Sequence, residues 1–160
     1  MFIGHLPGVY LALRPLQRRL PPLAFAAGLL CSVLPDLDLI WFYFVDNRAF
    51  HHHEYITHRP ILWAKVLLLG LLLRRFHHLT GSPIATLATG ALIHLCLDSI
   101  AGAVTWGWPW WDHKTTLVHV PATHDHWIKS FLAHWTFKVE ISLCVLAAAV
   151  WWRSRRARRP

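Results

Sequence analysis

Long apolar blocks dominate the pattern of hydrophobic and polar positions along this chain. The blocks cover roughly Leu23–Val45, Ile61–Leu73, Pro83–Val104 and Phe131–Trp152. A helix needs about 20 mostly apolar residues to cross the hydrocarbon core of a bilayer, and three of the blocks reach that length. The second block is shorter and needs its flanking residues to span. The pattern predicts an all-α, polytopic membrane protein with about four transmembrane helices.

The first apolar block is interrupted near its middle by a proline and two acidic residues. Pro35 lacks an N–H group and disfavours helix at the preceding residue, so we expect the first transmembrane helix to be broken near Pro35. Asp36 and Asp38 would point to nearly opposite sides of a regular helix, and share one site only if the backbone is irregular. The two aspartates could be metal ligands. Alternatively, Asp36 could be the N-cap of a helix that restarts at Leu37.

The positive charges divide the connections between the blocks into two kinds. The chain has a formal net charge of +8, and ten arginines precede block one, follow block two or follow block four: Arg14, Arg18, Arg19, Arg74, Arg75, Arg153, Arg155, Arg156, Arg158 and Arg159. Such alternation predicts a multi-pass protein whose C-terminus is cytoplasmic. A length of 160 residues indicates one domain, 1–160, ending in a basic cytoplasmic tail at 153–160. We expect the arginines to fix the orientation of the protein in the bilayer, with membrane lipids as their partners. We expect no nucleic-acid partner.

Acidic residues and most histidines fall on the other side of this division. All eight acidic residues avoid the arginine-bearing connections. Ionisable groups inside membrane spans are costly and are candidates for function by default. Six such residues lie within or at the ends of the apolar blocks: Asp36, Asp38, His94, Asp98, His134 and Glu140.

His94 and Asp98 are four residues apart, so they share one helix face and lie close together. An imidazole beside a carboxylate suits a shared metal ion, or an aspartate that orients a metal-bound histidine. A buried hydrogen bond that joins two helices fits the spacing equally well.

The connection after block one contains the run from His51 to His58. A histidine triplet is a weak signal for a site, because solvated histidine-rich tracts also occur. His58 stands immediately before a predicted span and makes ligation from this loop more plausible. Glu54 could be a ligand, a general base or a solvated charge, and of these readings we favour the last by a small margin.

Several hydrolytic and phosphate-binding chemistries are absent from the sequence. It has no G-x-S-x-G elbow, no glycine-rich phosphate loop and no H-E-x-x-H pair. The mixture of imidazoles and carboxylates instead suits a divalent metal ion such as Zn²⁺, Mn²⁺ or Fe²⁺.

These motifs resemble a bacterial family of inner-membrane-associated, metal-dependent hydrolases that is also described as LexA-binding. The resemblance rests on Pro35 to Asp38, on His53 to His58, and on His94 to Asp98. The opening Gly4-His5-Leu6-Pro7 and the stretch Gly102–Pro109 are also similar. Glu54, Tyr55 and Arg59 depart from the family's pattern. The resemblance implies a metal or catalytic set of His5, Asp36, Asp38, His53, His58, His94 and Asp98.

Residues and resemblance together lead us to expect a hydrolase of the bacterial inner membrane. It would hold a divalent metal ion near the outer face and act on a phosphate ester or lipid-linked substrate, with Glu54 as a candidate general base. In the simplest topology His5 falls on the arginine side, away from the other ligands. The alternative is a divalent-metal transporter or sensor without hydrolytic activity. A second alternative is an interaction protein that uses its arginine tail.

Overall fold

The computed structural model describes residues 3–157, and in this part of the chain every regular element is a helix. An isolated bridge between Val104 and Thr115 is the one β-type pairing among these residues. The helices are α1 (His5–Leu13), η1 (Arg14–Leu16), α2 (Pro22–Leu30), η2 (Pro35–Leu37), α3 (Asp38–Phe44), η3 (His52–Glu54), η4 (Ile56–His58), α4 (Pro60–Phe76), α5 (His78–Asp98), α6 (Trp127–Ala133) and α7 (Trp135–Arg156). The expected all-α fold is therefore confirmed.

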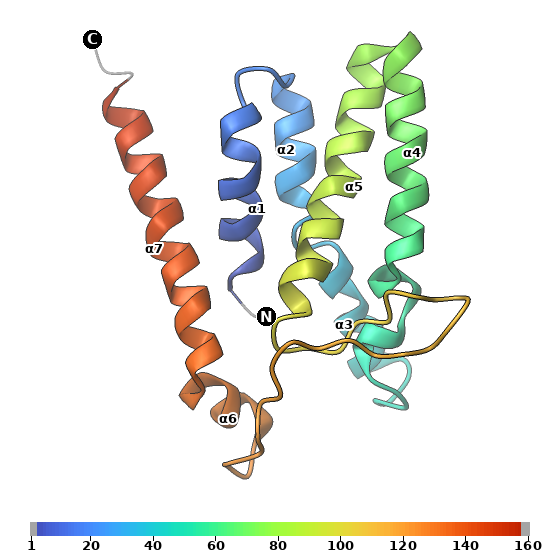
Figure 1. Ribbon diagram of the computed structural model, residues 1–160, viewed down its shortest axis with the longest axis vertical. Helices are drawn as coiled ribbons and strands as arrows, with labels where there is room; N and C mark the ends of the chain where they lie inside the picture. The colour runs from blue at the N-terminus through green and yellow to red at the C-terminus, as the bar shows by residue number, and fades with distance from the viewer. Residues whose placement is uncertain (1–2, 158–160) are drawn as a thin grey trace.

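The long helices run up and down beside one another (Figure 1). α1 leads away from the end that contains the N-terminus, α2 returns towards it, and α4 and α5 form a second antiparallel pair. α7 then runs to the far end. The turn after α1, the end of α4 and the end of α7 all lie at that far end, and each carries arginines. These arginines thus gather at one end of the molecule, whereas Arg48, after α3, and Arg59, at the start of α4, lie at the opposite end.

Small residues allow α2 and α5 to pack with their backbones almost in contact. A Cβ atom on Gly90 would lie 2.2 Å from the Gly28 carbonyl oxygen. Beside this contact, the Thr86 hydroxyl donates a hydrogen bond of 2.6 Å to the Ala24 carbonyl. Close approach at small residues with a hydroxyl between helices is typical of packing in membranes.

The number of candidate membrane spans is lower than the predicted four. Among the described residues, α5 and α7 are long and apolar enough to cross a bilayer, and α2 with the η2–α3 segment makes a third candidate bent by 44°. The block Ile61–Leu73 lies in α4, whose 17 residues fall short of the usual span. The first block is split, as predicted near Pro35, and α2 itself has nine residues. Apolar length in the sequence overstated the length of continuous helix.

The third and fourth apolar blocks also differ in their boundaries from the helices that the structure contains. The third block continues in sequence to Val104, but α5 ends at Asp98 and the chain enters a long irregular connection. The fourth block is divided at His134, which caps α7. The basic tail continues α7 as far as Arg156, and residues 158–160 lie outside the described part of the chain.

Candidate metal centre

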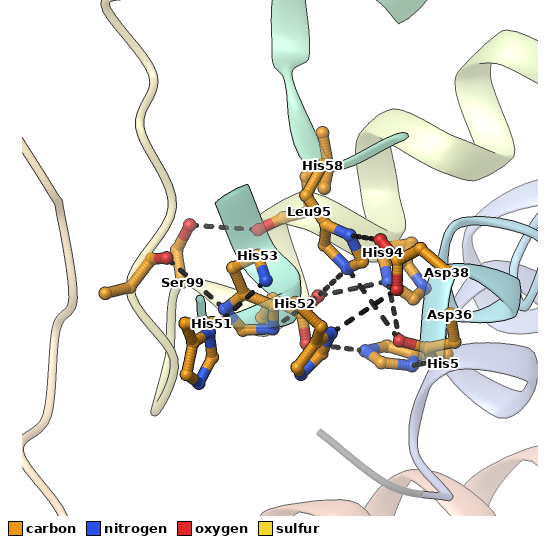
Figure 2. Close-up of polar contacts among 12 residues, drawn as sticks. His5, Asp36, Asp38, His51, His52, His53, His58, His94, Leu95 and Ser99 are labelled. Carbon is orange, nitrogen blue, oxygen red and sulfur yellow. Dashed lines mark hydrogen bonds and ion pairs between the residues drawn. The ribbon is translucent and has the colours of Figure 1, made fainter. Parts of the chain in front are cut away.

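Six short or terminal pieces of structure meet at the end opposite the arginines and bring histidines and aspartates together (Figure 2). α1 and α3 each contribute their first residue, and η4 contributes its last. The 3₁₀ turn η2 contributes its middle residue, η3 its first two residues, and α5 its last turn. The residues brought together are His5, Asp36, Asp38, His52, His53, His58, His94 and Asp98.

Local backbone structure explains why the two aspartates after Pro35 reach one site. Pro35 begins the 3₁₀ turn η2, where its missing N–H leaves no helical hydrogen bond unmade, and α3 starts at Asp38. This irregular backbone lets Asp36 and Asp38 both approach His58, with Oδ1 of Asp36 3.8 Å from Nε2 and Oδ2 of Asp38 2.6 Å from Nδ1. The break at Pro35 therefore brings the two aspartates to opposite nitrogens of one histidine ring, and that both act on one metal site stays a prediction.

Asp98 lies at the centre of the cluster. Its Oδ2 is 3.0 Å from Nε2 of His94, as their i, i+4 spacing predicted. The same oxygen is 3.5 Å from Nε2 of His58 and 3.7 Å from Nε2 of His53. Its Oδ1 is 3.0 Å from Nε2 of His5. One carboxylate, 1% exposed, therefore faces four imidazole rings.

Hydrogen bonds behind two of the rings determine which nitrogen carries the proton. Nδ1 of His94 lies 2.7 Å from the Ser32 carbonyl oxygen, and Nδ1 of His58 lies 2.6 Å from Asp38. Carbonyl and carboxylate oxygens only accept, so each Nδ1 donates and each neutral ring has its lone pair on Nε2. Both Nε2 atoms are buried and make no hydrogen bond within residues 3–157. On neutral rings, lone pairs of nitrogen thus face carboxylate oxygens, a repulsion that either a bound cation or a proton on one ring would remove.

The spacing of these atoms fits a divalent ion. Ligand atoms of Asp36, His58, His94 and Asp98 all lie within 4.8 Å of one another. The distances from the two Nε2 atoms to the carboxylate oxygens run from 3.0 to 3.8 Å. Tetrahedral coordination at about 2.1 Å requires ligand atoms separated by about 3.4 Å. The four separations between nitrogen and oxygen atoms therefore match those around a tetrahedral metal ion.

A second group of possible ligands adjoins the first. His52, His53 and His58 also have ring nitrogens within 4.8 Å of one another. Nδ1 of His53 is 3.3 Å from the Ala103 carbonyl oxygen, which leaves its Nε2 facing Asp98. The ring of His58 belongs to both groups, so the two are parts of one cluster.

The pKa values of the loop histidines reflect the same electrostatics. Burial lowers the pKa of His53 to about 3, so this ring is neutral and able to ligate at pH 7. Burial also opposes the charge of His58, but the carboxylates of Asp38 and Asp98 outweigh it and raise the pKa of His58 to about 9. Without a metal ion, the cluster therefore balances its carboxylates with a proton on His58.

The ring of His5 lies between the carboxylates of Asp36 and Asp98, with one nitrogen facing each. Its Nε2 lies 3.0 Å from Asp98 and its Nδ1 lies 3.3 Å from Asp36, and the residue is 1% exposed. The simplest topology, which put His5 on the arginine side, is wrong because α1 starts at the site and runs towards the arginines.

Comparison with known proteins decides the family. A family model described as YdjM inner membrane protein matches residues 1–159. The chain belongs to this family. No curated protein and no solved structure matches the chain. Membership in the YdjM inner membrane protein family, together with the apolar helices, supports the expected membrane protein; it carries no statement about hydrolysis or LexA.

Two of the predicted site residues, Asp38 and Glu54, lie outside both ligand groups of the described residues. Asp38 lies behind His58, where its Oδ2 also accepts a 2.6 Å hydrogen bond from the Thr57 hydroxyl. Glu54 accepts a 2.7 Å hydrogen bond from Lys114 at the surface, and this contact lowers its pKa. Its role as a general base stays a prediction.

Sequence reasoning missed three contributors to the cluster. His52 was read only as part of a histidine triplet, yet its Nδ1 lies 3.6 Å from Asp38. The other two are the backbone carbonyls of Ser32 and Ala103, which orient His94 and His53. A carbonyl leaves no trace in side-chain chemistry, so no motif could have revealed these two. His134 lies elsewhere, at the start of α7.

Proposed function

We propose that this protein is a metal-dependent hydrolase of the inner membrane that holds a divalent ion between Asp36, His58, His94 and Asp98. The observation that carries the proposal is the meeting of buried Nε2 atoms, which make no hydrogen bond among the described residues, with carboxylate oxygens at ligand spacing. The donor set suits Zn²⁺, Mn²⁺ or Fe²⁺ better than Mg²⁺ or Ca²⁺, which prefer oxygen ligands.

A divalent ion bound here would supply Lewis acidity, lowering the pKa of water and polarising a scissile oxygen. The chain's own residues would fix the ligands: Ser32 and Asp38 hold two imidazoles in the required tautomer, and His5 holds two carboxylates in place. Asp36, with a side chain 26% exposed against 1% for Asp98, forms the accessible edge. A substrate would therefore approach the cluster from the side of Asp36.

The substrate we propose is a phosphate ester or lipid-linked molecule. Its support is the location, because the cluster lies at one end of apolar helices, where a bilayer surface would present headgroups.

The positive-inside rule further supports multiple crossings with the arginine end in the cytoplasm and the cluster on the outer side. A C-terminal alkaline phosphatase fusion should be inactive and a C-terminal fluorescent protein fusion bright. The opposite pair of results would invert this orientation.

Metal analysis and hydrolysis assays on the full chain in detergent test the proposal. The purified protein should contain a stoichiometric divalent ion and should cleave phosphate esters presented in lipid vesicles. Asp98→Ala should lose both, whereas Asp112→Ala, which changes an exposed aspartate outside the cluster, should lose neither. Full metal occupancy in Asp98→Ala would refute the ligand assignment.

The rival function is metal transport or sensing with the same ligands. Near-complete burial of His58, His94 and Asp98 would suit a site that binds without turnover. Both ligand groups found among residues 3–157 lie at one end of the helices, and a transport path would require further groups along the bundle. Metal uptake into proteoliposomes without hydrolysis would establish this rival.

A further inference from the structure

Glu140 is a buried carboxylate that the proposed metal centre does not use. It lies in α7, which buries only three residues, Thr136, Glu140 and Ala147, against the rest of the protein. The side chain of Glu140 is fully buried. An ionisable group buried in an apolar helix is costly, so its partners indicate what it does.

The carboxylate of Glu140 caps the start of α1. Its Oε2 accepts hydrogen bonds of 2.6 Å from the N–H of Ile3 and 3.0 Å from the N–H of Gly4. Gly4 is the residue that precedes α1, and α1 receives no cap from a side chain at that position. Unsatisfied N–H groups are expensive away from water, and negative charge is favourable at the start of a helix. α7 therefore supplies to α1 a cap that α1 lacks.

The next residue after this contact is His5, whose two ring nitrogens face Asp36 and Asp98. The position of that ring depends on where α1 begins, and Glu140 fixes the backbone one and two residues before it. We propose that Glu140 is a positioning residue of the metal centre: it holds the start of α1 so that His5 keeps both carboxylates aimed at the ion. This inference rests on the proposed metal centre.

A purely structural role for Glu140 makes a different prediction. If it only joins α7 to α1, its loss should lower thermal stability and leave metal affinity unchanged. If it acts on the centre, Glu140→Ala should weaken Zn²⁺ binding by about 10-fold or more, as loss of groups that orient ligands typically does. Glu140→Gln keeps an acceptor oxygen and should restore most of the affinity. The measurement is Zn²⁺ affinity of the full chain in detergent, by competition with a chromogenic chelator.

The matched control is Thr136→Ala, a buried residue one turn earlier on α7 whose hydroxyl contacts His134. It should lower the melting temperature and leave Zn²⁺ affinity unchanged. The route through His5 is tested by a double-mutant cycle. On a His5→Ala background, Glu140→Ala should cost little further affinity. Additive losses would overturn the route through His5.

The outcomes separate this inference from the proposed centre. A wild-type protein that binds no metal would overturn the centre and this inference together. A wild-type protein that binds Zn²⁺, beside a Glu140→Ala variant of equal affinity, would overturn this inference alone. If Glu140→Ala does not fold, Glu140→Asp replaces it in the cycle, because one methylene fewer pulls the carboxylate away from Ile3 and Gly4.

Discussion

The contact between Asp38 and His58 allows a quantitative test of the proposed centre. Asp38→Asn keeps the shape of the side chain and an acceptor oxygen for Nδ1 of His58, but removes the negative charge 2.6 Å from that ring. Burial lowers the pKa of His58, but the carboxylates of Asp38 and Asp98 outweigh it and raise the pKa from 6.5 to about 9, a net difference worth roughly 3 kcal/mol. If Asp38 supplies about half of it, the loss corresponds to about 10-fold in affinity at Nε2.

This value agrees with the 10- to 100-fold, or about 1.4–2.7 kcal/mol, typical of partners that orient metal-bound histidines. We therefore expect Asp38→Asn to bind Zn²⁺ with unchanged stoichiometry and with affinity reduced about 10- to 100-fold. Chelator competition measures the affinity, and elemental analysis measures the stoichiometry.

Asp46→Asn is the matched control, because it changes a nearby aspartate that bonds to Tyr55 instead of a cluster histidine. It should leave Zn²⁺ affinity unchanged. Unaltered affinity in folded Asp38→Asn would refute the idea that this carboxylate tunes His58. Complete loss of bound metal would instead make Asp38 a direct ligand, as the family resemblance implied.

Three further predictions follow from the same contacts. Removing metal with a chelator should lower the melting temperature in detergent, and Zn²⁺ should restore it, because an ion that binds only the folded state stabilises that state. Protons compete with metal at His58, whose pKa is raised to about 9. The affinity for Zn²⁺ should therefore fall as the pH drops below 9, by up to about 10-fold per pH unit. Binding of the metal should also release protons into a weakly buffered solution. Gly90→Ala puts a Cβ 2.2 Å from the Gly28 carbonyl and should destabilise the fold by about 1–3 kcal/mol; an unfolding midpoint equal to wild type would show that α2 and α5 are not packed as described.

Much of the architecture could be predicted because its physical causes are local. Apolar blocks indicate helices, alternate arginines indicate which ends lie together, and the spacing of His94 and Asp98 places them on one face. Pro35 marks a break because it cannot donate a backbone hydrogen bond. Each of these signals is carried by residues close together in the chain.

The features that could not be predicted from the sequence depend on tertiary structure. The direction of α1, and with it the place of His5, follows from a hairpin of two nine-residue helices that are too short to register as spans. Whether Asp38 ligates or supports depends on which imidazole nitrogen it meets, which spacing does not encode. The number of crossings was overestimated because apolar composition continues through breaks that backbone geometry imposes.

Because Asp98 lies at the centre of the cluster, tight binding of the proposed ion would require that the protein has already folded. Its two oxygens face rings from α1, η3, η4 and α5, and His5 is 93 residues away along the chain. A loop of that length must close before the ring can meet the carboxylate. Until it does, the nascent helices hold isolated histidines and aspartates with weak affinity for an ion. If the proposed ion binds there, its tight occupancy would report that the tertiary structure is complete, and a metal assay would then measure correct assembly of the protein.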